Sequence, residues 1–77
     1  MENKMADVTL HIDENTSHDQ RENFRVSLLA MNGVMAAAYH DDKPHLVVVE
    51  YDPDIIKSSN FIKVAKENGL HAELVGL

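Results

Sequence analysis

The chain has 77 residues, which is enough for one small domain with a modest core. It contains no cysteine, so disulfides, thiolate metal sites and cysteine nucleophiles are excluded. The formal net charge of −6 makes nucleic acids and anionic lipids poor partners, because an acidic surface repels phosphates. No apolar run approaches the roughly 20 residues of a membrane-spanning helix, and no signal-peptide core follows the N-terminus. We therefore expect a soluble, cytoplasmic protein.

The first half of the chain predicts a strand and a helix. Residues 8–12 alternate apolar and polar side chains, which is the pattern of a half-buried strand. After a polar loop, Phe24, Leu28 and Met31 recur at spacings of four and three residues and form the apolar stripe of a helix. Asn32-Gly33 ends this helix, because glycine readily takes the left-handed conformation that favours a helix C-terminus.

The second half predicts a hairpin, a second helix and a last strand. Residues 34–39 and the β-branched residues 46–51 are expected to be two strands of a hairpin, joined by turn-forming residues. Ser58 is placed to act as the N-cap of a helix that extends through Asn68. Residues 72–74 alternate, with the two outer side chains facing inward, on a final strand.

The predicted order of elements is βαββαβ, the ferredoxin-like arrangement. This is an α+β fold with a four-stranded antiparallel sheet and two helices on one face. Three segments resemble the heavy-metal-associated domain of copper chaperones and metal-transporting ATPases. Asn32-Gly33-Val34 resembles its Pro-Gly-Val after the first helix, residues 47–53 resemble its third strand and exit turn, and residues 69–75 resemble its last loop and strand.

The resemblance runs from about residue 8 to residue 75 without a gap. It implies that residues 1–77 form a single heavy-metal-associated-like domain, with a core over about residues 7–75. Members of that family bind soft cations such as Cu(I) through the two thiolates of a Cys-x-x-Cys motif in the loop before the first helix. Soft metals select soft sulfur ligands, so this motif is the feature that carries the family's activity.

Two polar residues replace the thiolates in this chain. Counting back from Gly33 places the family's cysteines at Ser17 and Gln20, and of the Met-Thr that precedes them only Thr16 is present. A hydroxyl and an amide are hard, neutral groups that suit a soft metal poorly, so the resemblance implies the fold without the activity. Ser17-x-x-Gln20 also matches the capping box, in which each side chain bonds the other residue's backbone amide and stabilises the helix start.

Five histidines raise the question of a different metal site: His11, His18, His40, His45 and His71. The βαββαβ topology places the first loop, the central hairpin and the last loop at one end of the sheet. His18 is the candidate ligand because it lies inside the degenerate loop, and imidazole would favour zinc or copper. Against this, we expect the hairpin to lie across the sheet from the first loop. The alternative is that these histidines are solvated loop residues with no cofactor.

The sheet face without helices is expected to be apolar in part. If the odd-numbered residues of strand 46–51 pack under the helices, its even-numbered residues face the other way. The register implied by the resemblance adds residues from the second and last strands. The candidate interface residues are Ala36, Ala38, Leu46, Val48 and Val75. An exposed apolar patch next to an uncharged sheet edge indicates a homodimer or another protein partner.

No nucleophile motif, phosphate-binding loop or paired-carboxylate arrangement indicates an enzyme. The sequence favours a non-catalytic module with a heavy-metal-associated fold that acts in protein–protein interaction or self-association. The alternative function is metal binding or metal delivery, with His18 and other nitrogen or oxygen ligands in place of the cysteines.

Overall fold

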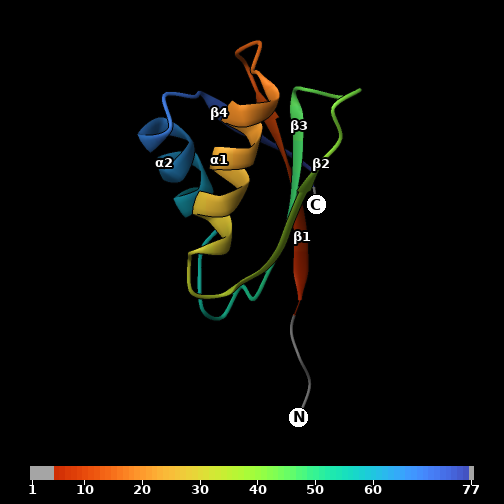
Figure 1. Ribbon diagram of the computed structural model, residues 1–77. Coiled ribbons are helices and arrows are strands. Elements are labelled where there is room, and N and C mark those ends of the chain that lie inside the picture. The colour runs from red at the N-terminus through yellow and green to blue at the C-terminus, as the bar shows by residue number, and fades with distance from the viewer. Residues whose placement is uncertain (1–4, 77) are drawn as a thin grey trace.

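The computed structural model describes residues 5–76 and has the predicted order of elements (Figure 1). In chain order, the elements are β1 (Ala6–Ile12), α1 (His18–Leu29), β2 (Val34–Tyr39), β3 (Leu46–Tyr51), α2 (Ser59–Glu67) and β4 (Ala72–Gly76). Within residues 5–76, neither helix has the length and apolar composition needed to cross a membrane.

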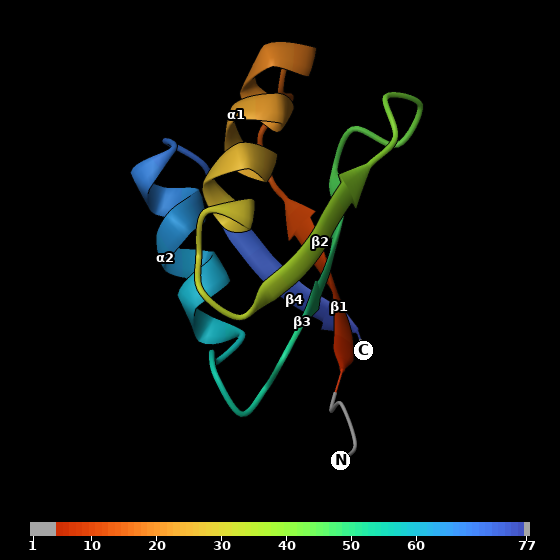
Figure 2. The ribbon, with the colours of Figure 1, turned by 60° about the horizontal axis from the view of Figure 1, so that its bottom comes forward.

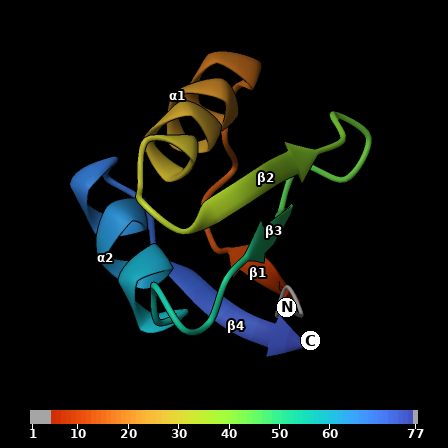
Figure 3. The same cartoon turned by 90° about the horizontal axis from the view of Figure 1, so that it is seen from below.

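The four strands form one antiparallel sheet in the order β2-β3-β1-β4. Both helices cover the same face of this sheet, as the views along and across the strands show (Figures 2 and 3). The predicted ferredoxin-like α+β fold is therefore confirmed. We call the opposite face, which no helix of the described chain covers, the open face.

The hydrophobic core lies between the sheet and the two helices. Alternate residues of the central strands are buried, as the period-2 pattern predicted. The fully buried large side chains are Val8, Leu10, Ile12, Phe24, Leu28, Val47, Val49, Phe61 and Leu70. Met31, which was predicted to lie on the first helix, lies in the turn after α1 and packs against this core from there. The same alternation sends the intervening residues of β1 and β3 to the open face.

The outer strands depart from simple alternation. In β2 the register with β3 shifts between Val34 and Ala36, and in β4 the register with β1 shifts beside Leu10. Leu74 lies on the helix-covered face as predicted, because it pairs with the buried Leu10 of β1, but its place on an edge strand leaves it 44% exposed. The register shift lies at the sheet edge, where a strand with one neighbour tolerates an irregular ladder.

Both helices begin at the predicted residues, and α2 also ends as predicted, but α1 ends earlier than predicted, at Leu29 with Ala30 as its C-cap. Gly33 and Gly69 follow the helices with φ of +98° and +75°, the left-handed region that glycine takes without strain. Ser58 occupies the N-cap position of α2, yet its side chain makes no capping hydrogen bond. Its backbone is already helical there, whereas a capping side chain needs an extended backbone.

Three loops meet at one end of the sheet, as the topology predicted, and we call this the loop end. The N–H of Ile12 donates to the carbonyl of His45 at 2.7 Å, which joins the end of β1 to the β2–β3 loop. The N–H of Asp13 donates to the carbonyl of His71 at 2.9 Å, which joins it to the α2–β4 loop. The β1–α1 loop lies at this same end (Figure 1).

Candidate functional sites: the β1–α1 loop and the open face

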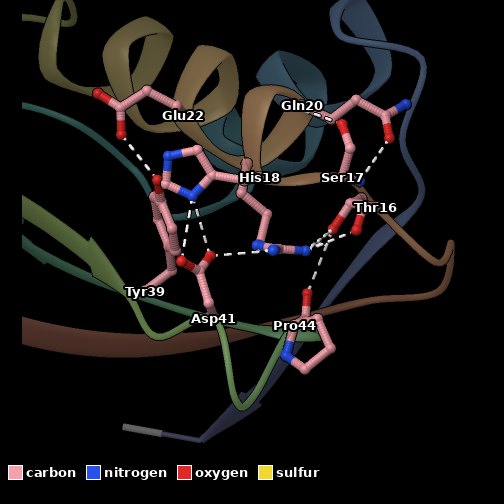
Figure 4. Close-up of polar contacts among 9 residues, drawn as sticks. Thr16, Ser17, His18, Gln20, Glu22, Tyr39, Asp41 and Pro44 are labelled. Carbon is pink, nitrogen blue, oxygen red and sulfur yellow. Dashed lines mark hydrogen bonds and ion pairs between the residues drawn. The ribbon is translucent and has the colours of Figure 1, made fainter.

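The β1–α1 loop holds the start of α1 through the predicted capping box (Figure 4). The Gln20 N–H donates to Ser17 Oγ at 3.1 Å, and the Ser17 N–H donates to Gln20 Oε1 at 2.8 Å. Ser17 and Gln20, which the sequence resemblance aligns with the family's cysteines, therefore hydrogen-bond to each other's backbone at the start of α1. A hydroxyl and an amide oxygen are hard, neutral donors, and each one here already accepts a hydrogen bond from the backbone.

The Arg21 side chain is buried beneath this loop and carries a positive charge there. Its side chain is only 7% exposed, and one guanidinium nitrogen, Nη1, donates to the Thr16 carbonyl at 2.6 Å and to Thr16 Oγ1 at 2.9 Å. The second nitrogen, Nη2, donates to Asp41 Oδ1 at 3.0 Å. The guanidinium also lies 5.8 Å from the centre of the Tyr39 ring, within cation–π range. A permanent cation of the chain itself thus lies beside the degenerate loop.

Arg21 was not singled out from the sequence, although a signal was present. It precedes Phe24 by three residues and Leu28 by seven, so it lies on the apolar stripe of α1. A charged residue on such a stripe must find internal partners when it is buried. The partners themselves come from the β1–α1 and β2–β3 loops, whose positions no local pattern gives.

His18 faces the β2–β3 loop rather than an open ligand position (Figure 4). Its Nδ1 lies 3.0 and 3.1 Å from the two carboxylate oxygens of Asp41, and its ring meets the Tyr39 ring edge-on at 5.8 Å. The expectation that the hairpin lies far across the sheet from the first loop is therefore wrong. The reason is that α1 packs towards β2, which brings the helix N-terminus to the hairpin.

The Asp41 carboxylate favours the charged form of His18. Its hydrogen bond and its negative charge raise the pKa of His18 above the ordinary value, although the imidazole is well exposed. In turn, the hydrogen bonds from His18 and Arg21 hold the pKa of Asp41 below its ordinary value. A metal ion at His18 has to compete with this protonated state, since only neutral imidazole ligates.

The other histidines of the loop end do not gather around His18. His71 donates from its backbone N–H and its Nδ1 to Glu14, at 2.8 and 2.6 Å, which lowers the pKa of that carboxyl. His45 Nδ1 lies 2.6 Å from the Ile12 carbonyl. Within residues 5–76, one group of three potential ligands comes together, namely His11, Asp13 and Glu73. No pattern in the sequence indicated this group, because it depends on the pairing of β1 with β4.

Four of the five predicted interface residues gather on the open face. Ala36 pairs with Glu50 and Ala38 pairs with Val48 across β2 and β3, and Leu46 follows on the same face of β3. Val48 is 44% exposed, and both alanines are exposed as well. A shallow hollow of about 210 Å³ lies here, lined by Thr9, Ala38, Tyr39, His40, Lys43, Leu46 and Val48.

The fifth predicted interface residue lies apart from the others. Val75 is exposed on β4, which is the far edge strand. Strand β1 separates β4 from β3, and its half-buried or exposed residues Asp7, Thr9 and His11 are polar. The apolar part of the open face is therefore confined to β2 and β3. We call the cluster of Ala36, Ala38, Leu46 and Val48 the apolar patch.

No protein-family model matches the sequence, and no curated protein is significantly similar to it. Solved structures are similar in fold. The N-terminal domain of a potential copper-translocating P-type ATPase from Bacillus subtilis, in its Cu(I)-loaded state, has a TM-score of 0.85 and 21% identity, with 94% of this chain and 89% of that chain covered. A copper-binding domain from HMA7, a P-type ATPase, has a TM-score of 0.82 and 18% identity, covering 91% and 93%.

A third solved structure extends the comparison beyond ATPases. Oxidised MerP from Ralstonia metallidurans CH34 has a TM-score of 0.82 and 16% identity, with 91% of this chain and 96% of that chain covered. The class that these similarities define is the fold of heavy-metal-associated, copper-chaperone-like domains. This chain has that fold without any cysteine, and Ser17 and Gln20 form a capping box at the degenerate motif.

Proposed function

We propose that this chain is a non-catalytic cytoplasmic module of residues 1–77 that acts by protein–protein interaction, including association with a second copy of itself. The apolar patch on the open face is the observation that carries this proposal. An antiparallel sheet with one uncovered face normally alternates polar residues outward, and contiguous exposed apolar surface usually marks an interaction site. Val75, on β4, belongs to a separate and secondary contact.

The adjacent sheet edge supports the same proposal. β2 pairs with β3 on one side only, and none of its six residues is charged. Edge strands of monomeric proteins are usually protected by lysine, proline or a covering segment, because free N–H and C=O groups invite another strand. A partner that covers the apolar patch can therefore also extend the sheet along β2.

The chemistry of the β1–α1 loop supports a function other than Cu(I) binding. A soft cation needs polarizable sulfur ligands, and this loop offers a hydroxyl and an amide that are already hydrogen-bonded to the backbone. The buried Arg21 guanidinium adds a positive charge that repels a second cation. Retention of the fold is then best explained by use of its surface.

The test is sedimentation velocity over a wide protein concentration range, with Val48→Glu as the disrupting variant. Val26→Glu is the matched control, because Val26 is 53% exposed on α1, on the helix-covered side. We expect the wild type and Val26→Glu to sediment faster as concentration rises, and Val48→Glu to remain monomeric. A wild type that stays monomeric at high concentration and behaves like Val48→Glu would contradict the proposal.

Metal binding through His18 is the second candidate function. The Asp41 carboxylate at Nδ1 supports it, because carboxylates often orient a ligating histidine in this way and leave Nε2 free for zinc or copper. If this candidate holds, Zn²⁺ or Cu²⁺ raises the melting temperature of the wild type and not that of His18→Ala. An equal rise in both proteins would exclude His18 as the ligand.

A further inference from the structure

We propose that His11, Asp13 and Glu73 form a binding site for a divalent first-row transition-metal ion, separate from the β1–α1 loop. One donor atom from each side chain lies within 4.8 Å of the other two. His11 and Glu73 are direct cross-strand partners on β1 and β4, and Asp13 follows the last residue of β1. The sheet register therefore brings His11 and Glu73 together, and the hydrogen bond from the Asp13 N–H to the His71 carbonyl holds the backbone of Asp13 beside β4.

The distances between these side chains suit shared ligation of one metal ion better than direct hydrogen bonds between them. His11 Nδ1 and Asp13 Oδ1 are 3.4 Å apart, which is longer than a good N–H···O hydrogen bond. Two ligands of a tetrahedral zinc ion, each about 2.0–2.1 Å from the metal, are about 3.4 Å apart. The Glu73 carboxylate lies within 4.8 Å of both groups, and water can complete the coordination.

The cluster contains two negatively charged carboxylates, which a bound cation would neutralise. Asp13 and Glu73 place two carboxylates close together on a chain whose formal net charge is −6. Among the ion pairs of residues 5–76, no lysine or arginine pairs with either of them, in contrast to Asp41, which Arg21 neutralises. The side chains of His11 and Asp13 are 42% and 52% exposed, so an ion from solvent can reach them.

His45 acts as a positioning residue for this site. Its ring stacks on the His11 ring, with centroids 5.5 Å apart and an interplanar angle of 11°. The Ile12 carbonyl can only accept, so His45 Nδ1 carries the proton of their 2.6 Å hydrogen bond. This bond fixes the His45 ring against the backbone of β1, and the fixed ring limits the rotation of His11. Held side chains lose less freedom on binding an ion.

The ligand set defines the class of metal. Imidazole favours Zn²⁺, Ni²⁺ and Cu²⁺, whereas carboxylates alone would favour Mg²⁺ or Ca²⁺. One imidazole with two carboxylates therefore points to a borderline divalent ion, for which Zn²⁺ is the practical probe. The absence of sulfur separates this site from any Cu(I) chemistry.

The test is calorimetric titration of the full metal-free chain with ZnCl₂, with the site located by amide NMR shifts. The site variants are His11→Gln and Glu73→Gln, and His18→Gln tests the second candidate function. The matched control is His40→Gln, which removes an exposed histidine of the β2–β3 loop at the same end of the sheet. We expect one saturable Zn²⁺ per chain, affinity weakened about tenfold or more in each site variant, and little change in the control. Equal melting temperatures in EDTA will show that the variants are folded.

Three outcomes would overturn this proposal: a wild type with no saturable binding, site variants that bind Zn²⁺ as well as the wild type, or a loss confined to His18→Gln. The last outcome would support the second candidate function instead. Because self-association is measured without metal, failure of the metal site and failure of the interaction proposal are distinguishable.

Discussion

At the scale of single residues, the β1–α1 loop is stabilised by hydrogen bonds within the chain. Ser17 and Gln20 close on each other, and Arg21 joins the loop at Thr16 to the hairpin at Asp41. The account therefore predicts a stability role for the polar network around Arg21.

Replacing Arg21 tests that role. Arg21→Met keeps an apolar stem of similar length but removes the donors to Thr16 and Asp41. We expect a loss of about 2 kcal/mol in the free energy of unfolding. Hydrogen bonds to charged groups contribute about 1.5–3 kcal/mol each, and the packing of the methionine side chain offsets part of their loss. Urea unfolding measures this loss. Lys63→Met, an exposed change on α2, is the control and should alter stability by less than about 0.5 kcal/mol.

The His18–Asp41 pair predicts a pH dependence of stability. The folded pKa of His18 is raised, so its contribution is complete below the ordinary histidine value of about 6.5 and is lost as pH rises through the folded value. The folded pKa of Asp41 is lowered, so its contribution is present above about pH 4 and is lost as pH falls through the folded value. The destabilisation caused by His18→Gln should therefore be larger at about pH 5.5 than at about pH 8.5.

A double-mutant comparison isolates this effect. In an Asp41→Asn background the carboxylate that raises the His18 pKa is gone, so His18→Gln should lose its pH-dependent difference. Urea unfolding of the four proteins at the two pH values gives the comparison. A His18→Gln effect of equal size at both pH values in the Asp41 protein would show that the pair is not formed in solution.

At the scale of elements, the two helices begin in different ways, and the difference can be measured. The Ser17 hydroxyl accepts from the helix backbone, whereas the Ser58 side chain makes no capping bond. Ser17→Ala should lower the unfolding free energy by about 1 kcal/mol, and Ser58→Ala should leave it nearly unchanged. For a domain of this size the Ser17 change corresponds to about 4–8 °C in melting temperature. Equal melting temperatures for the two variants would contradict the capping role of Ser17.

The elements that local patterns encode were predictable, and the contacts between loops were not. The bounds of β2 and β3 agree with the prediction because β-branched or uncharged runs end at turn residues. The capping box was predictable because its partners are three residues apart. The exposure of Leu74 was not, since the alternation within one strand does not show that the strand lies at the edge of the sheet.

The candidate sites show the same difference: the apolar patch was predictable, and the charged clusters were not. The apolar patch followed from alternation along β3 together with the register that the family resemblance implied for β2. The Arg21–Asp41 and His11–Glu73 contacts join residues 20 and 62 positions apart, and both depend on how the helix and the strands pack. Sequence spacing therefore identified the surface and missed the charged clusters.

At the scale of the whole molecule, two surfaces are accessible to a binding partner in solution. The loop end carries the hydrogen-bonded β1–α1 loop, with Arg21 fixed beneath it, and the open face carries the apolar patch (Figures 1 and 3). The two solved P-type ATPase domains compared above share this fold at TM-scores of 0.82 and 0.85. Since fold does not determine function, the use of this chain depends on which surface binds.

The central claim is that the open face, and not the β1–α1 loop, is the functional surface. Amide-resolved NMR of the metal-free protein tests both surfaces in one experiment, first with rising protein concentration and then with added Cu(I). The account predicts concentration-dependent shifts or broadening at Ala36, Ala38, Leu46 and Val48, and no saturable Cu(I) shift at residues 16–20. Saturable Cu(I) shifts at residues 16–20, with an open face that does not respond to concentration, would contradict it.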